Sequence, residues 1–118
     1  MKIKASKLSS NTIIPKQESD GAAGFDLRSI EDGIIPPKSH KLIRTGLVID
    51  PPRNILPIVF SRSGLALKNK IHSNTHTLSN KKQEVIINMF NGSNKAFNYN
   101  VGDRIAQLVF CELENADN

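Results

Sequence analysis

The segment EVIINMFNGSNKAFNYNVGDRIAQLVFCE, residues 84–112, holds three short apolar runs separated by turn residues. The runs are rich in Ile, Val and Phe and are too short for ordinary helices. Between them, 91–94 is expected to form a hairpin loop and 101–103 the next turn. The segment therefore predicts consecutive β-strands at 84–90, 96–99 and 104–112.

The same pattern of short apolar runs continues through the first half of the chain. Two proline pairs, at 36–37 and 51–52, would start or stop strands because proline has no N–H to donate to a sheet. No stretch has the length and periodicity of an ordinary helix, although 64–68 could form a turn or two. The chain is therefore predicted to be all-β, as a sandwich, jelly roll or barrel. Four further strands are expected, the last two weaker: 41–48, 54–60, and the residues near Ile3 and Ile34.

Length and composition predict one domain. A chain of 118 residues can bury a single core unaided. Hydrophobic residues make up 38% of the sequence, and none of the apolar runs is long enough to span a membrane. The start, MKIKASKLSS, lacks the apolar stretch of a secretory signal. We therefore expect a cytoplasmic or nuclear protein with no membrane partner.

The formal net charge of +5 raises the question of nucleic-acid binding, because lysines and arginines release counterions from phosphates. The basic residues are scattered along the chain, however, and aromatic residues make up 5% of it, too few for a base-stacking platform. The composition argues against a nucleic-acid partner. It fits a solvated basic surface or a site for one anionic small molecule.

Two segments could carry phosphate chemistry. GAAGFDL at 21–27 combines small residues, which let a backbone approach closely, with one acid, Asp26. By itself this pattern is equally typical of a glycine-rich turn before a strand. Arg62, Ser63 and Gly64 combine a guanidinium, a hydroxyl and a glycine ahead of a helical turn. Exposed N–H groups at such a turn, aided by the arginine, predict a cradle for a di- or triphosphate.

A third segment, GDRIAQL at 102–108, is a turn that leads into a strand. Arg104 and Gln107 interrupt its apolar residues. Taken alone, the pattern also fits a β-edge with a surface pair between Asp103 and Arg104, which would stabilise the fold little.

In order and spacing, GAAGFDL, SRSGLA and GDRIAQLV resemble the first, second and fourth signature motifs of the trimeric dUTPase family. IIPPKSHKLIRTGLVIDPP at 34–52 is similar to that family's connecting strands, so the resemblance covers most of the chain. It implies a single domain over 1–118 with a jelly-roll-like, distorted β-barrel fold. It also implies a homotrimer with sites between subunits, and hydrolysis of dUTP to dUMP and pyrophosphate with Mg²⁺.

The resemblance assigns roles to individual residues. Asp26 would help to organise the site around the water shell of the metal. The phosphates would be held by Arg62, Ser63 and Gly64, while Gln107 and also Arg104 would line the same pocket from another chain.

The third motif departs from the family pattern. The family has a glycine-containing hairpin that closes on uracil, an aspartate that orients the attacking water, and a tyrosine that packs under the deoxyribose. The corresponding segment here, 71–85, is about one residue short and contains neither an aspartate nor a tyrosine. Ser79 is the best match for the aspartate, and Lys81 or Lys82 for the tyrosine. The glycine-rich fifth motif has no counterpart after Leu113.

The missing aspartate matters because a water that attacks phosphorus must give up a proton. A positioned base typically contributes ~10²–10⁴-fold to such a step. His72 and His76 are the remaining candidate bases in this segment, although loop histidines are more often solvent-exposed residues. Glu84 is a further carboxylate, but we expect it to open a strand and to face solvent or pair with a lysine.

Two hypotheses about function follow. The first is a dUTPase-like protein that keeps the fold and part of the phosphate cradle but has little or no catalysis, and that acts by binding a nucleotide or a protein partner. The alternative is an active dUTP or nucleoside triphosphate diphosphatase with an altered base or specificity. In both, Mg²⁺ is expected with a bound nucleotide, and no side chain is expected to ligate it directly.

Overall fold

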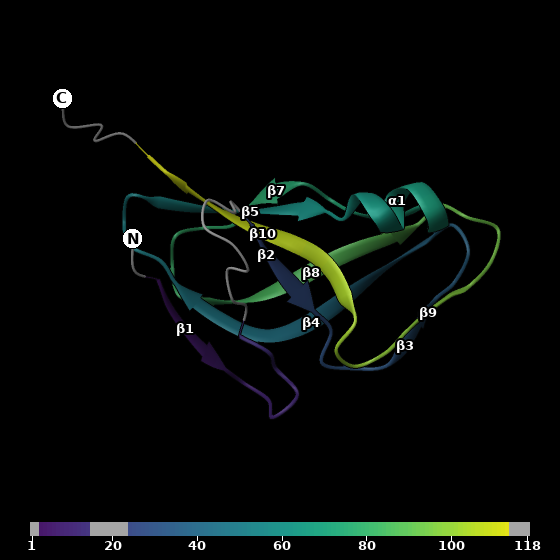
Figure 1. Ribbon diagram of the computed structural model, residues 1–118, viewed down its shortest axis with the longest axis horizontal. Coiled ribbons are helices and arrows are strands. Elements are labelled where there is room, and N and C mark those ends of the chain that lie inside the picture. The colour runs from purple at the N-terminus through teal and green to yellow at the C-terminus, as the bar shows by residue number, and fades with distance from the viewer. Residues whose placement is uncertain (1–2, 15–23, 114–118) are drawn as a thin grey trace.

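The computed structural model describes residues 3–14 and 24–113 (Figure 1). This part of the chain contains ten strands and one short helix. Their bounds are β1 Lys4–Lys7, β2 Gly24–Arg28, β3 Gly33–Ile35, β4 Ser39–Asp50, β5 Ile55–Ser61, α1 Ser63–Asn69, β6 Ile71–Ser73, β7 His76–Thr77, β8 Gln83–Asn91, β9 Phe97–Tyr99 and β10 Arg104–Glu112.

The strands form two four-stranded sheets and one two-stranded sheet, with antiparallel pairing throughout. The strand orders are β1-β4-β8-β6, β2-β10-β5-β7 and β3-β9. Figure 1 shows β10 running along the molecule beside β2 and β5, with α1 following β5. The all-β, jelly-roll-like fold predicted from the sequence is confirmed.

The core is formed mainly by the inward faces of the two larger sheets, with Ile35 and Tyr99 added from the two-stranded sheet. In β8 the residues alternate, so that Val85, Ile87 and Met89 are buried while Glu84 and Ile86 are more exposed. This alternation is what a strand with one buried face requires. Each fully buried large apolar side chain contributes about 1.5–3 kcal/mol relative to an exposed one. The period-two pattern of these runs therefore predicts both the strand and the face it buries.

The loop 91–94 is not the hairpin that we expected. The strand that follows it, β9, pairs with β3 and not with β8, and Gly33 lies opposite Tyr99 in that register. A Cβ on Gly33 would lie within 2.4 Å of the Tyr99 ring, so this pairing requires glycine. The side chain of Asn91 donates through Nδ2 to the carbonyl of Ile35 at 2.9 Å and ties the loop to β3. A distant contact thus decides the path of the loop.

Three strands were not among the predictions: β2, β6 and β7. Two of them have three residues or fewer, and β2 follows a glycine-rich stretch. Their pairing comes from neighbours that are distant in sequence, since β2 pairs with β10, β6 with β8 and β7 with β5. Short polar strands give little periodic signal, so their existence depends on the sheet that receives them. Among the described residues, no helix is long and apolar enough to cross a membrane.

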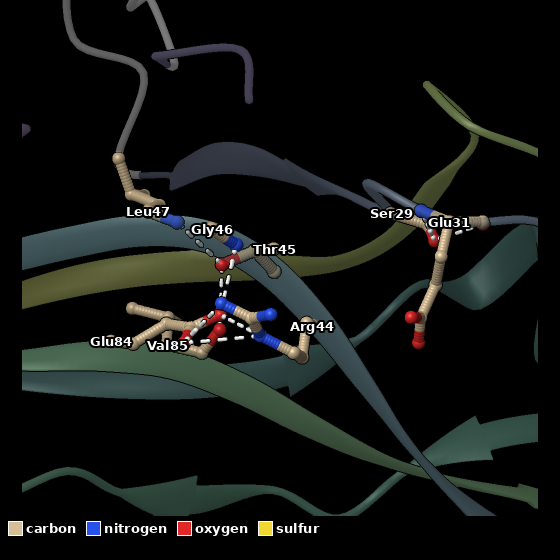
Figure 2. Close-up of polar contacts among 8 residues, drawn as sticks. All are labelled: Ser29, Glu31, Arg44, Thr45, Gly46, Leu47, Glu84 and Val85. Carbon is tan, nitrogen blue, oxygen red and sulfur yellow. Dashed lines mark hydrogen bonds and ion pairs between the residues drawn. The ribbon is translucent and has the colours of Figure 1, made fainter. Parts of the chain in front are cut away.

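A register shift in the pairing of β4 with β8 is held by Glu84 (Figure 2). Its carboxylate accepts from the Arg44 guanidinium at 2.9 Å and from the N–H of Gly46 at 3.1 Å. The hydrogen bond from Arg44, followed by the charge of Glu84, raises the pKa of Arg44 above its ordinary value. We expected Glu84 to face solvent or pair with a lysine. Its partner is Arg44, because residue 44 is the last regular position before the shift.

The hydroxyl of Thr45 completes the same irregularity. It donates to the carbonyl of Val85 at 2.6 Å and accepts the N–H of Leu47 at 3.1 Å. The side chain is 2% exposed, so water cannot replace these bonds. Two backbone groups at the irregularity therefore depend on one hydroxyl.

Replacing Thr45 with valine keeps the volume of the side chain and removes both hydrogen bonds. We expect Thr45→Val to lower the free energy of unfolding by about 1–3 kcal/mol, because two buried backbone groups lose their partner. Urea denaturation at fixed protein concentration measures the change. Thr77→Val, at an exposed position, is the matched control and should change stability by less than about 0.5 kcal/mol. Equal effects of the two variants would contradict this account.

Candidate functional site

The predicted phosphate residues lie where β5 passes into α1. Arg62 has an extended backbone, with φ −82° and ψ 124°, before the helix begins at Ser63. Its carbonyl accepts the N–H of Ala66 at 3.1 Å, which begins the helical turn. No acidic residue lies in the first turn. A Cβ on Gly64 would meet nothing within 4 Å, so there is open space where a side chain of residue 64 would stand.

Asp26, Gln107 and Phe60 form one row across three neighbouring strands. The register of β10 sets Gln107 directly opposite Asp26 of β2 and directly opposite Phe60 of β5. Directly opposite residues of antiparallel strands project from the same face. This is the outer face of the sheet, because the flanking residues Ala106 and Leu108 are buried. The sheet thus brings together two of the predicted site residues.

Arg104 lies on the same strand as Gln107, beside this row. Its Nη1 is 3.7 Å from Oδ2 of Asp26, and the two side chains are 49% and 24% exposed. The Arg62 guanidinium donates through Nη1 to the carbonyl of Arg104 at 3.3 Å. Arg28, which was not among the predicted site residues, is opposite Arg104 in the register. Its spacing of two from Asp26 within a strand is the sequence signal that could have identified it.

One carboxylate and three guanidinium groups therefore meet at one end of the sheet. The long and partly exposed contact between Arg104 and Asp26 neutralises at most one of the three positive charges. Arginine presents planar N–H donors that match phosphate and carboxylate oxygens. The chemistry of this cluster suits an anion with several charges.

We expected Gln107 and Arg104 to reach the pocket of Asp26 and Arg62 from another subunit. The structure instead shows all four residues together in one chain. Gln107 and Arg104 lie beside Asp26 within one subunit, because β10 pairs with β2 of the same chain. Arg104 also contacts Arg62 within that chain. The roles of these residues in binding stay predictions.

The segment matched to the catalytic aspartate forms a closed turn. Gln83 donates through Nε2 to the carbonyl of Ser79 at 2.6 Å, to its hydroxyl at 3.0 Å and to the carbonyl of Lys81 at 3.0 Å. Asn80 donates through Nδ2 to the carbonyl of Arg53 at 2.9 Å. The side chains around Ser79 thus bind the backbone of the turn, and no acid lies in it.

Within one chain the two candidate histidines lie away from β2, which carries Asp26. His76 is on β7 opposite Val59, and β5 and β10 separate it from β2 by about 14 Å at normal strand spacing. Its Nδ1 lies 2.7 Å from the carbonyl of Asn74. A carbonyl only accepts, so Nδ1 carries the proton and Nε2 is left for another partner. His72 is on β6 of the other sheet, opposite Phe90.

Comparisons with known proteins agree with this architecture. The sequence model of the dUTPase family matches residues 10–117. The deoxyuridine 5'-triphosphate nucleotidohydrolase of Encephalitozoon cuniculi is 42% identical over an alignment of 118 residues, gaps included. The alignment covers 95% of this chain and 82% of that protein. The protein of the same name from Helicobacter pylori strain J99 is 38% identical over 120 residues, covering 99% of this chain and 83% of its relative.

A solved structure of similar fold is a mutant dUTPase from phage phi11 of Staphylococcus aureus, described as coordinating a structural Mg(II) ion. The two structures superpose with a TM-score of 0.90 over 98% of this chain and 93% of that chain, at 20% sequence identity. This likeness establishes the fold, and the extended sequence matches establish the relationship. The chain belongs to the dUTPase family.

Proposed function

We propose that this member of the dUTPase family binds a nucleoside triphosphate, with dUTP as the first candidate, and hydrolyses it slowly or not at all. The observation that carries the proposal is the contrast between two parts of the chain. Arginines gather around Asp26 at one end of a sheet. The segment that should supply the base is a turn in which Gln83 binds the backbone and hydroxyl of Ser79.

Phosphate binding in this proposal depends on Arg62 and Arg104. Arg62 uses Nη1 for the Arg104 carbonyl at 3.3 Å, and a guanidinium has five N–H donors, so others remain for phosphate oxygens. Gln107 and the open backbone around Gly64 would add neutral donors. The negative charge of Asp26 is offset by Arg104, so a polyphosphate would still meet a positive surface.

Slow hydrolysis follows from the absence of an available base near this cluster in the described part of the chain. Asp26 lies beside Arg104, which favours its role in ordering water over proton transfer. Glu84 is in the other sheet, where it accepts from Arg44 and from the N–H of Gly46. Ser79 cannot replace a carboxylate near neutral pH. Loss of a positioned base alone would slow the step by ~10²–10⁴-fold.

Mg²⁺ enters this proposal with the nucleotide. Among the residues that the structure describes, no three His, Cys, Asp or Glu side chains gather to hold a metal. The single carboxylate of Asp26 is partly exposed and has one cationic neighbour. Mg²⁺ commonly keeps several waters and is held by one or two carboxylates together with substrate phosphates. The residues therefore fit an ion that the phosphates ligate and whose waters Asp26 orders.

A second candidate function is an active diphosphatase with a histidine base. The observation that favours it is the contact of His76 Nδ1 with the Asn74 carbonyl, which orients the ring and leaves Nε2 as an acceptor. Because β5 and β10 lie between β7 and β2, His76 would have to act on a nucleotide bound by another subunit. A screen of deoxy- and ribonucleoside triphosphates with the variants His72→Ala and His76→Ala tests this candidate. Hydrolysis that His76→Ala abolishes would support it.

Titration of dUTP with Mg²⁺ by calorimetry tests the phosphate cradle. We expect measurable binding to the unmodified protein and about 10- to 100-fold weaker binding to Arg62→Met, because charge-assisted hydrogen bonds are lost. Arg53→Met removes an exposed arginine elsewhere and should leave the affinity unchanged. Equal affinity of Arg62→Met and the unmodified protein would place the nucleotide elsewhere.

Pyrophosphate release from dUTP with Mg²⁺ tests the catalytic half of the proposal. With the Encephalitozoon cuniculi relative assayed in parallel, we expect release at least ~100-fold slower for this protein, since the base is missing. A rate close to that of the relative would overturn the proposal of weak catalysis. Binding without release would support it.

The family is typically trimeric, and we infer that this chain forms a homotrimer through the outer face of β4 and β8. Leu42 and Ile86 on this face are 65% and 40% exposed. Phe90 lies in one row between His40 and His72, and its ring centroid is 4.8 Å from that of His40. Exposed apolar side chains on two adjacent strands are suited to burial between subunits.

The charge distribution also favours a contact between this face and a second copy of the chain. The chain carries a net charge of +5, so its copies repel one another unless the contact region is neutral. The charged residues beside Ile86 are Arg44 and Glu84, which form an ion pair with each other at 2.9 Å. The face can therefore be buried without bringing unpaired cations together.

Light scattering on the purified protein tests the trimer. We expect the mass of three chains of 13.0 kDa each, and we expect Leu42→Glu to shift the mass toward one chain because it buries a charge at the interface. Leu67→Glu on α1, at a side chain that is 85% exposed, is the matched control and should stay trimeric. Dissociation by Leu67→Glu and not by Leu42→Glu would place the interface elsewhere.

A further inference from the structure

Arg28 is an arginine of the cluster to which neither the family motifs nor the function proposed above assigns a task. It is the last residue of β2, and it shares the outer face with Asp26, two residues before it. Its side chain is partly buried and donates through Nη1 to the carbonyl of Gly102 at 2.8 Å. This bond joins residues that are 74 positions apart in the sequence. It links the end of one strand to the turn that begins another.

The turn that accepts this bond is held at several points. Gly102 has φ +88°, a left-handed conformation that glycine adopts readily, and its N–H donates to the carbonyl of Ser29 at 2.8 Å. The N–H of Ser29 donates in return to the carbonyl of Asp103 at 3.0 Å. The carboxylate of Asp103 accepts the N–H of Asn100 at 2.8 Å. Two side chains reach the turn from outside it: Asp32, whose Oδ1 accepts the N–H of Val101 at 2.8 Å, and Arg28 at the end of β2.

Arg104 directly follows this turn, so the conformation of the turn sets the position of the Arg104 backbone. Its Cα lies opposite that of Arg28, and the register shifts between residues 104 and 106. The irregular pairing means that the regular ladder does not by itself hold Arg104 in place. Besides the backbone bond from Ser29 to Asp103, two side-chain bonds support the backbone around Arg104: Arg28 to the Gly102 carbonyl at 2.8 Å, and Arg62 to the Arg104 carbonyl at 3.3 Å.

We propose that Arg28 is a positioning residue for the anion site: by holding the Gly102 carbonyl it fixes the turn 100–103 and thereby places Arg104 for the phosphates. Its remaining N–H groups add positive charge on the same face. The proposal rests on the proposed function, because it names a residue that prepares the same phosphate site. It goes beyond that function because it makes the affinity for the nucleotide depend on Arg28, which forms its hydrogen bond with the protein's own Gly102 carbonyl.

Two measurements on the same variants test the proposal. The first is amide hydrogen exchange at 101–104 without nucleotide, and the second is the affinity for dUTP with Mg²⁺ and for inorganic pyrophosphate. We expect Arg28→Met to speed exchange at 101–104 by about tenfold and to weaken both affinities about tenfold. Amides of core residues such as Val59 and Leu108 should keep their protection. Arg28→Lys retains one donor and should restore most of the protection and of the affinity.

Two further variants separate positioning from other effects. Arg62→Met should weaken binding without changing exchange at 101–103, which its bond to the Arg104 carbonyl does not reach, and Arg53→Met should change neither. The proposal is overturned if Arg28→Met binds as tightly as the unmodified protein, if exchange at 101–104 is unaltered, or if protection is lost across the core, which would indicate a general structural role. If the unmodified protein binds neither dUTP nor pyrophosphate, the proposed function fails and this proposal falls with it. Binding that Arg62→Met weakens and Arg28→Met does not overturns the role of Arg28 alone.

Discussion

The pairing of β10 with β2 on one side and with β5 on the other is the constraint on which the candidate site depends. It sets Gln107 opposite Asp26 and brings Arg104 beside Arg62, the residue that follows β5. The opposite face of the same strand belongs to the core, where Leu108 is buried. Because side chains alternate along a strand, a slip of one residue would bury Gln107 and expose Leu108. The hydrophobic core therefore enforces the register that assembles the site.

Binding of an anion and activation of a water belong to different parts of this fold. The first needs positive charge and N–H donors, which β2, β10 and the start of α1 supply within one chain. The second needs a base at a defined position, which the resemblance to the family's third motif predicts for the segment between β7 and β8. In this chain the segment is a turn whose polar side chains bind its own backbone. Of this turn, Leu78 packs against the core, whereas its polar side chains lie at the surface.

Side-chain hydrogen bonds hold two turns of the protein, 100–103 and 79–83, but their partners differ. Near the site, Asp103 accepts the N–H of Asn100, and Arg28 reaches the turn from another strand. In the other turn, Gln83 contacts the Ser79 hydroxyl and nearby carbonyls, all within a few residues. The first turn is fixed by a long-range bond, so its position is defined relative to the sheet. The second is held mainly by its own residues and by the bond from Asn80 to the Arg53 carbonyl, and none of these bonds involves the clustered arginines.

The sequence by itself determined the all-β class, most of the longer strands, the family and the candidate residues Asp26, Arg62 and Gln107. Those features follow from local period-two alternation and from motifs of fixed spacing. Tertiary structure decided what depends on distant partners: the pairing of β9 with β3 in place of a hairpin at 91–94, and the short strands β2, β6 and β7. It also decided that Arg104 lies beside Asp26 in the same chain. Backbone hydrogen bonds between strands are available to any partner of suitable register, so the choice among partners is made by packing of the whole core.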